Sequence, residues 1–135
     1  MAQPDYGDAG KRHALDAGLL LKAARYDGAS HLAGLAAECG LKALVGASLT
    51  PSPTGHGPPT LAGQKAGHLP DLWGTAMSNL RTRHRPDSAV AGLISRDSNP
   101  FADWEMETRY ARSNSVNKQA AERHLLAARA VVAAL

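Results

Sequence analysis

Residues 25–44 read RYDGASHLAGLAAECGLKAL, and this stretch decides the fold. Nearly every position from Ala29 to Val45 is small or aliphatic, which is typical of a helix surrounded by other helices. We expect Asp27 to cap the start of this helix, with Gly28 in its first turn. The turn before it is too short for anything but an antiparallel pair of helices. The helix is predicted to end near Leu49.

Three long polar side chains interrupt this apolar helix, namely His31, Glu38 and Lys42. At about 100° per residue they fall on one narrow stripe, which must meet solvent, a partner subunit or a site. The plainer interpretation is an ion pair between Glu38 and Lys42 at i,i+4, worth a few tenths of a kcal/mol. The single cysteine, Cys39, lies in the same helix, where a thiol is more often a small core residue than a nucleophile.

The 135 residues are enough for one domain with a modest core, and we treat residues 1–135 as one unit. Aromatic residues make up only 4% of the chain, so the core must consist of closely spaced helices. The net charge of +3 is too small to indicate nucleic-acid binding by itself. No run approaches a membrane span and no signal peptide is visible, so we expect a cytoplasmic, bacterial-type protein without a membrane partner.

The segments around the central helix are predicted from local patterns. Residues 1–7 are expected to be flexible, and Asp8 to cap a first helix that runs to about Ala24. That helix is expected to pack through leucines, which are Leu15, Leu19, Leu20 and Leu21. Residues 50–67 are expected to form a long mobile loop, because the four prolines between Thr50 and Thr60 prevent helix or sheet there.

The later helices show clearer periodicity. A third helix is predicted from a stripe at helical spacing, formed by Leu69, Leu72, Trp73, Ala76, Met77 and Leu80. It ends in a basic cluster that either complements the helix dipole or binds phosphate through Arg81, Arg83 and Arg85. A short fourth helix reaches about Ser95, and residues 101–112 are expected to be extended. Asn117 is the predicted cap of the last helix, whose stripe is Ala121, Leu125, Ala128, Val132 and Leu135, with His124 at its edge. The chain is therefore predicted to be an all-α antiparallel bundle of about five helices.

Five segments, in order, resemble HEPN domains, the higher eukaryote and prokaryote nucleotide-binding domains. Residues 19–29 and 37–44 are similar to the first helical hairpin of that family. Residues 67–73 are similar to the start of its third helix, and residues 104–110 with 120–135 to its tryptophan segment and last helix. The resemblance covers about the whole chain. It implies a helical bundle that works as a homodimer, often beside a minimal nucleotidyltransferase in a toxin–antitoxin or defence system.

Many members of that family are metal-independent ribonucleases that use an arginine followed, after four to six residues, by a histidine. The only such pair here is Arg25 and His31, and it lies in the first hairpin, which is the wrong place for the motif. We therefore expect a non-catalytic domain that binds a nucleotide, an RNA or a cognate partner protein. A ribonuclease that uses Arg25 and His31, and a purely structural dimer or adaptor, remain alternatives.

The candidate ligand-binding residues are Glu38, Lys42, His68, Arg109 and Tyr110. The triplet Thr108-Arg109-Tyr110 matches a family pattern, although Ala111 replaces the usual proline. A guanidinium beside an aromatic ring can hold a phosphate and a base. The alternative is that Arg109 forms an ion pair with Glu38 and fixes the extended segment to the bundle. No nucleotide-binding glycine pattern and no metal-site spacing is visible, so no cofactor and no metal are expected.

Overall fold

The computed structural model describes residues 4–46, 49–50, 59–61, 64–65, 67–83, 88–95 and 98–135. Within these ranges the chain is mostly helical, which confirms the predicted all-α class. The elements, in chain order, are α1 (Tyr6–Lys22), α2 (Tyr26–Leu44), β1 (Leu49–Thr50), β2 (Thr60–Leu61), β3 (Gln64–Lys65), α3 (Asp71–Arg83), α4 (Ser88–Ile94), the 3₁₀ helix η2 (Met106–Tyr110) and α5 (Lys118–Ala133).

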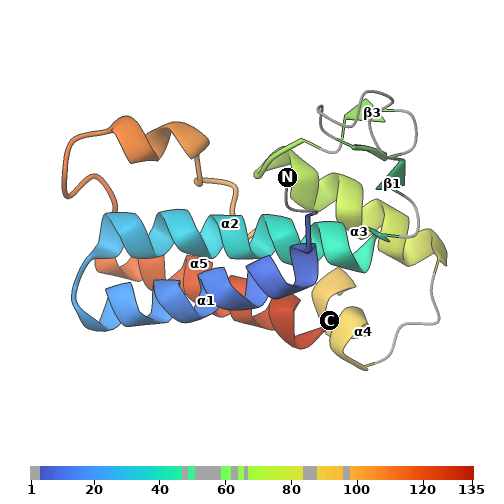
Figure 1. The fold of residues 1–135 in the computed structure, drawn as a ribbon, viewed down its shortest axis with the longest axis horizontal. Coiled ribbons are helices and arrows are strands. Elements are labelled where there is room, and N and C mark those ends of the chain that lie inside the picture. Colours follow the sequence, from blue (N-terminus) through green and yellow to red (C-terminus); the bar gives the residue numbers. More distant parts are fainter. Residues whose placement is uncertain are drawn as a thin grey trace.

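Helix α2 is the centre of the arrangement. It packs against α1, α3, η2 and α5, and α1 also packs against α5. Figure 1 shows α1, α2 and α5 side by side along the long axis, with α3 next to the second half of α2 and η2 on an arm above its first half. This placement agrees with the apolar composition of α2, because a helix with neighbours on most sides needs few polar residues.

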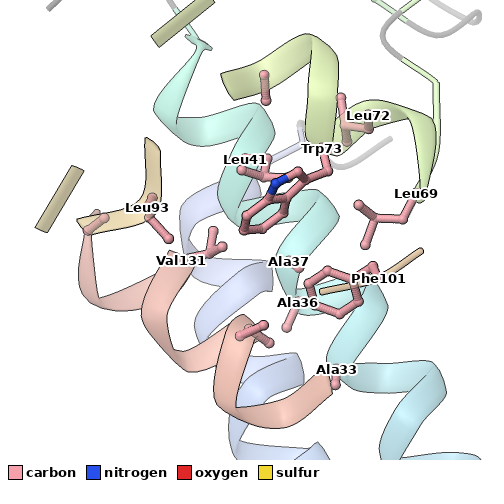
Figure 2. Close-up of a cluster of buried hydrophobic side chains, with 14 of the residues drawn as sticks. Ala33, Ala36, Ala37, Leu41, Leu69, Leu72, Trp73, Leu93, Phe101 and Val131 are labelled. Carbon is pink, nitrogen blue, oxygen red and sulfur yellow. The ribbon is translucent and has the colours of Figure 1, made fainter. Parts of the chain in front are cut away.

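The core is built around small residues of α2. Ala33, Ala36 and Ala37 are fully buried, and the larger side chains of Trp73 and Phe101 lie against this surface (Figure 2). The stripe predicted for α3 is confirmed, because all six of its residues are at most 4% exposed. Small residues on the central helix let bulky side chains from other elements fill the core at normal packing density.

Helix α1 differs from the prediction at its start and on its buried face. Asp5, not Asp8, is the cap, since Asp5 Oδ1 accepts a hydrogen bond from Asp8 N at 3.0 Å. The expected packing through Leu15 and Leu19 is wrong, because these side chains are 73% and 66% exposed. The buried positions are instead Gly10, Ala14, Ala17 and Gly18. A stripe of small residues lets α1 approach α2 closely, and Leu15 and Leu19 are left on the outer face, whereas the half-buried Leu21 packs against the core as expected.

The start and the end of α2 also correct the prediction. Arg25 occupies the cap position without a side-chain bond. Asp27 lies inside the first turn, where its carboxylate accepts hydrogen bonds from Asn114 N at 2.6 Å and Val116 N at 2.8 Å. Asp27 therefore fixes the segment before α5, not the start of its own helix. The helix ends at Leu44, earlier than the expected Leu49, because Leu49 belongs to β1.

The region predicted as a long loop is described only in part. Residues 51–58, 62–63 and 66 lie outside the described ranges, so the expected mobile loop is not addressed there. The described parts form a small antiparallel sheet in the order β1-β2-β3. The expectation of no sheet is wrong at the ends of the stretch, because Thr50 pairs with Thr60. Leu61 of β2 is only 2% exposed, and its burial in the core attaches this strand to the helical bundle.

The last third of the chain confirms one cap and corrects one segment. Asn117 Oδ1 accepts a hydrogen bond from Ala120 N at 2.8 Å, as predicted for the start of α5. The segment expected to be extended contains the 3₁₀ helix η2. On α5, Val131 is fully buried, whereas Val132 is half-buried and Leu135 is 42% exposed. The buried stripe therefore turns toward Val131 as the helix approaches its end.

Candidate functional site

Glu38 and His68 are the two predicted ligand-binding residues that the fold brings into contact. Glu38 is only 4% exposed, and its carboxylate accepts hydrogen bonds from Leu69 N at 2.9 Å and from His68 Nδ1 at 3.2 Å. Neither Lys42 nor Arg109 is ion-paired with Glu38, so both pairs considered from the sequence are wrong. The buried carboxylate takes its partners from the two residues His68 and Leu69, which lie just before α3, and one of these partners is a main-chain N–H group. Lys42 Nζ lies 5.6 Å from the ring centroid of Tyr6.

Arg109 and Tyr110 form an exposed pair on η2. The guanidinium carbon lies 4.8 Å from the ring centroid of its neighbour, and the tyrosine is 78% exposed. Because η2 packs against α2, the pair sits near His31, and the positive charge of Arg109 helps to lower the pKa of that histidine.

His31 is half-buried beside this pair. Its ring is stacked with that of Trp104, with 6.0 Å between centroids and an interplanar angle of 11°. Burial is the main cause that lowers its pKa, followed by Arg109, while Glu38 acts in the opposite direction. The Nδ1 atom is buried and has no hydrogen-bond partner. His31 is therefore a neutral ring at pH 7 with one unsatisfied nitrogen.

Two other sets of predicted residues are not assembled into a site. Arg25 is exposed at the start of α2 and makes no hydrogen bond or ion pair with His31. Arg81 donates a hydrogen bond to Ile94 O at 2.9 Å, which ties α3 to α4. The side chain of Arg83 and the whole of Arg85 lie outside the described part of the chain, so the phosphate patch stays a prediction.

The structure also contains a polar network that the sequence did not reveal. Ser30 Oγ lies 2.8 Å from His124 Nδ1, and His124 Nε2 lies 2.8 Å from Asp103 Oδ1. Arg123 donates two hydrogen bonds to Asp103, at 2.9 and 2.7 Å. The guanidinium of Arg123 is the main cause that holds the pKa of Asp103 well below its usual range. Burial lowers the pKa of His124, because desolvation outweighs the nearby carboxylate.

The reason for missing this network is separation along the chain, since Ser30 and His124 are 94 positions apart. The available signal was a polar residue on each of two apolar helix stripes. Both side chains are only 2% exposed. Because a buried polar group needs a partner, two such residues on packed helices are candidates for each other.

A cavity of about 200 Å³ lies beside the network. It is bordered by Ser30, Asp103, Trp104, Thr108, Ser115, Val116, Asn117, Ala120 and His124. A shallower cavity of about 400 Å³ lies on α3 beside Trp73, Arg81 and Asn99. Within the described ranges, no group of three His, Cys, Asp or Glu side chains is placed to hold a metal ion.

The comparisons with models of protein families, with curated proteins and with solved structures find no match for this chain. None of the helices in the described ranges has both the length and the apolar character needed to cross a membrane.

Proposed function

We propose that this chain is a HEPN-like helical domain that binds a nucleotide or an RNA through the surface formed by Arg109 and Tyr110. The observation that supports this is the guanidinium of Arg109 over an exposed aromatic ring, next to the neutral ring of His31. A cation contacts phosphate, while an exposed aromatic face stacks on a base.

Binding is a better proposal than cleavage of RNA. The one pair with ribonuclease spacing places Arg25 at an exposed helix start and stacks His31 on Trp104. A pair that acts together on one phosphate needs both groups within reach of it. The ribonuclease alternative therefore gains no support from this geometry.

The partners are proposals that rest on the resemblance, and the cytoplasm stays a prediction from the sequence pattern. The partners are a second copy of the chain and a minimal nucleotidyltransferase in a toxin–antitoxin or defence system. The exposed pair of Leu15 and Leu19 on α1 supports a protein partner, because large exposed apolar side chains that lie together often mark an interface.

The test is a binding titration with fluorescently labelled single-stranded RNA and with ATP. Arg109→Ala is expected to weaken binding. It should also reduce the slope of log K against log salt concentration by about the value of one phosphate contact. Arg109→Lys retains the charge and part of the affinity. Arg12→Ala is the matched control, since it removes the same charge from an exposed position on α1. If the variants at Arg109 and Arg12 bind alike, or if the wild type binds neither probe, the proposal is wrong.

A further inference from the structure

The hydrogen bonds of the Ser30–His124–Asp103 network have a defined direction. Because its pKa is held low, Asp103 is a carboxylate and can only accept, so His124 Nε2 carries the proton. The lowered pKa of His124 keeps its ring neutral near pH 7, which leaves a lone pair on Nδ1. The hydroxyl of Ser30 must then donate to Nδ1 across the 2.8 Å contact. A neutral imidazole is thus placed to remove the proton of a serine hydroxyl.

The imidazole is held on three sides. Asp103 fixes one nitrogen, Ser30 contacts the other, and the ring of Phe101 stacks on its face with 5.4 Å between centroids and 15° between planes. Arg123 holds the carboxylate by two bonds and so fixes its position in turn. An oriented base beside a hydroxyl, with a carboxylate behind the base, activates a serine for nucleophilic attack; here the serine faces Nδ1 and the carboxylate Nε2, the reverse of the usual order.

The cavity provides space and favourable electrostatics next to this hydroxyl. Ser30 and His124 both border it, and so do Asn117, which caps α5, and Ala120 in the first turn of that helix. The first N–H groups of a helix have no partner within the helix, and the helix dipole favours negative charge at that end. Because the Ala120 N–H already donates to Asn117 Oδ1, this helix start acts on an oxyanion through its dipole and not through that N–H group. A volume of about 200 Å³ accommodates only a small acyl group.

We propose that Ser30 is the nucleophile of an acyl-transfer site whose substrates are small carboxylic esters. Ser30 Oγ forms a bond to the acyl carbon as the ester C–O bond breaks. The hydroxyl proton passes to His124 Nδ1 and then to the leaving alkoxide. Water hydrolyses the acyl-serine in the second step, with His124 accepting its proton and returning it to Ser30. Asp103 is a positioning residue. This activity is separate from the ligand surface at Arg109, and its failure leaves that proposal untouched.

The first experiment uses the full chain and a small alkyl fluorophosphonate, which forms a bond from phosphorus to a nucleophilic serine with loss of fluoride. Peptide mass spectrometry is expected to locate the adduct at Ser30, and the same protein is expected to release nitrophenolate from p-nitrophenyl acetate. Both signals should be lost in Ser30→Ala and retained in Ser78→Ala, which changes an exposed serine of α3. Absence of the Ser30 adduct in folded wild-type protein overturns the proposal.

A second variant keeps the test decisive if Ser30→Ala fails to fold. Asp103 is about half exposed, so Asp103→Asn leaves the core intact, which circular dichroism checks. The amide is expected to favour the wrong histidine tautomer and to slow labelling at least tenfold. In wild type the labelling rate should fall on acidification with a midpoint below 6.5, because protonation of His124, which faces Asp103 and Arg123, removes the base. An equal rate in Asp103→Asn, with the same pH profile, contradicts the proposal.

Discussion

A buried histidine is tolerated in α5 because both of its nitrogens are bonded. His124 contacts Ser30 on one side and Asp103 on the other, so neither ring nitrogen is left unsatisfied. An unpaired buried polar atom costs about 1–3 kcal/mol, and a buried charge costs more. The folded chain therefore favours a neutral His124 and an ionised Asp103.

This gives a pH prediction at the scale of single residues. The pKa of His124 is lower in the folded chain than its ordinary value of 6.5, so the unfolded chain binds the proton more readily. The free energy of unfolding is expected to fall as the pH drops from about 6.5 to 5. The lowered pKa of His31 acts in the same direction. The lowered pKa of Asp103 causes a further loss of stability as the pH falls below 3.8, the ordinary pKa of that group.

Urea denaturation at a series of pH values measures this dependence. His124→Gln is expected to lower the stability at pH 7, since it disturbs the network, but also to flatten the slope between pH 6.5 and 5. An identical slope in the variant and the wild type would show that another group is responsible for the pH dependence.

The role of a single residue can be predicted from the sequence when its hydrogen-bond partner lies only a few positions away. The cap at Asn117 was predictable because its oxygen bonds to an N–H three residues away. The role of Asp27 was not, since its carboxylate bonds to N–H groups of Asn114 and Val116, nearly 90 positions along the chain. A residue type suited to capping predicts that a carboxylate will meet free N–H groups, but it does not say which ones.

At the scale of elements, the approach of the 98–106 segment to α2 depends on Gly34. A Cβ added there would overlap the indole of Trp104, which donates from Nε1 to Ser30 O at 2.9 Å. Gly34→Ala is expected to destabilise the fold by about 1–3 kcal/mol, because the indole must move and its hydrogen bond is strained. Thermal or urea denaturation measures the change.

Gly74 on α3 is the matched control for this substitution. A Cβ there meets nothing within 4 Å, and the residue is exposed. Gly74→Ala is therefore expected to stabilise by about 0.5–1 kcal/mol, as alanine restricts the unfolded chain and favours the helix. If both substitutions change the stability equally, the close approach at Gly34 does not constrain the fold.

The elements were predictable to different degrees for a physical reason. The stripe on α3 was found because large apolar side chains at helical spacing have one natural position, the core. On α1, Leu15 and Leu19 gave the wrong face, because glycine and alanine carry little hydrophobic signal and yet form the contact with α2. Where helices pack through small residues, side-chain size is a poor guide to which face is buried.

At the scale of the whole molecule, the outer face of α1 is a candidate contact surface between two copies of the chain. Leu15 and Leu19 are one turn apart and both largely exposed, so they form a continuous apolar surface. The resemblance to HEPN domains predicts a homodimer. If this surface is the contact between copies, burying the two leucines of each protomer supplies part of the association free energy.

Sedimentation velocity over a range of concentrations tests this assembly. The wild type is expected to dimerise, and Leu19→Lys to raise the dissociation constant at least tenfold, since a buried lysine would lose hydration without a partner. The substitution should leave the circular dichroism spectrum unchanged, because the position is exposed within one chain. Leu126→Lys on α5 is the control, as that leucine is similarly exposed, at 67%, but lies on another helix. A wild type that stays monomeric at high concentration would rule out the dimer, and a larger effect of Leu126→Lys would place the interface on α5.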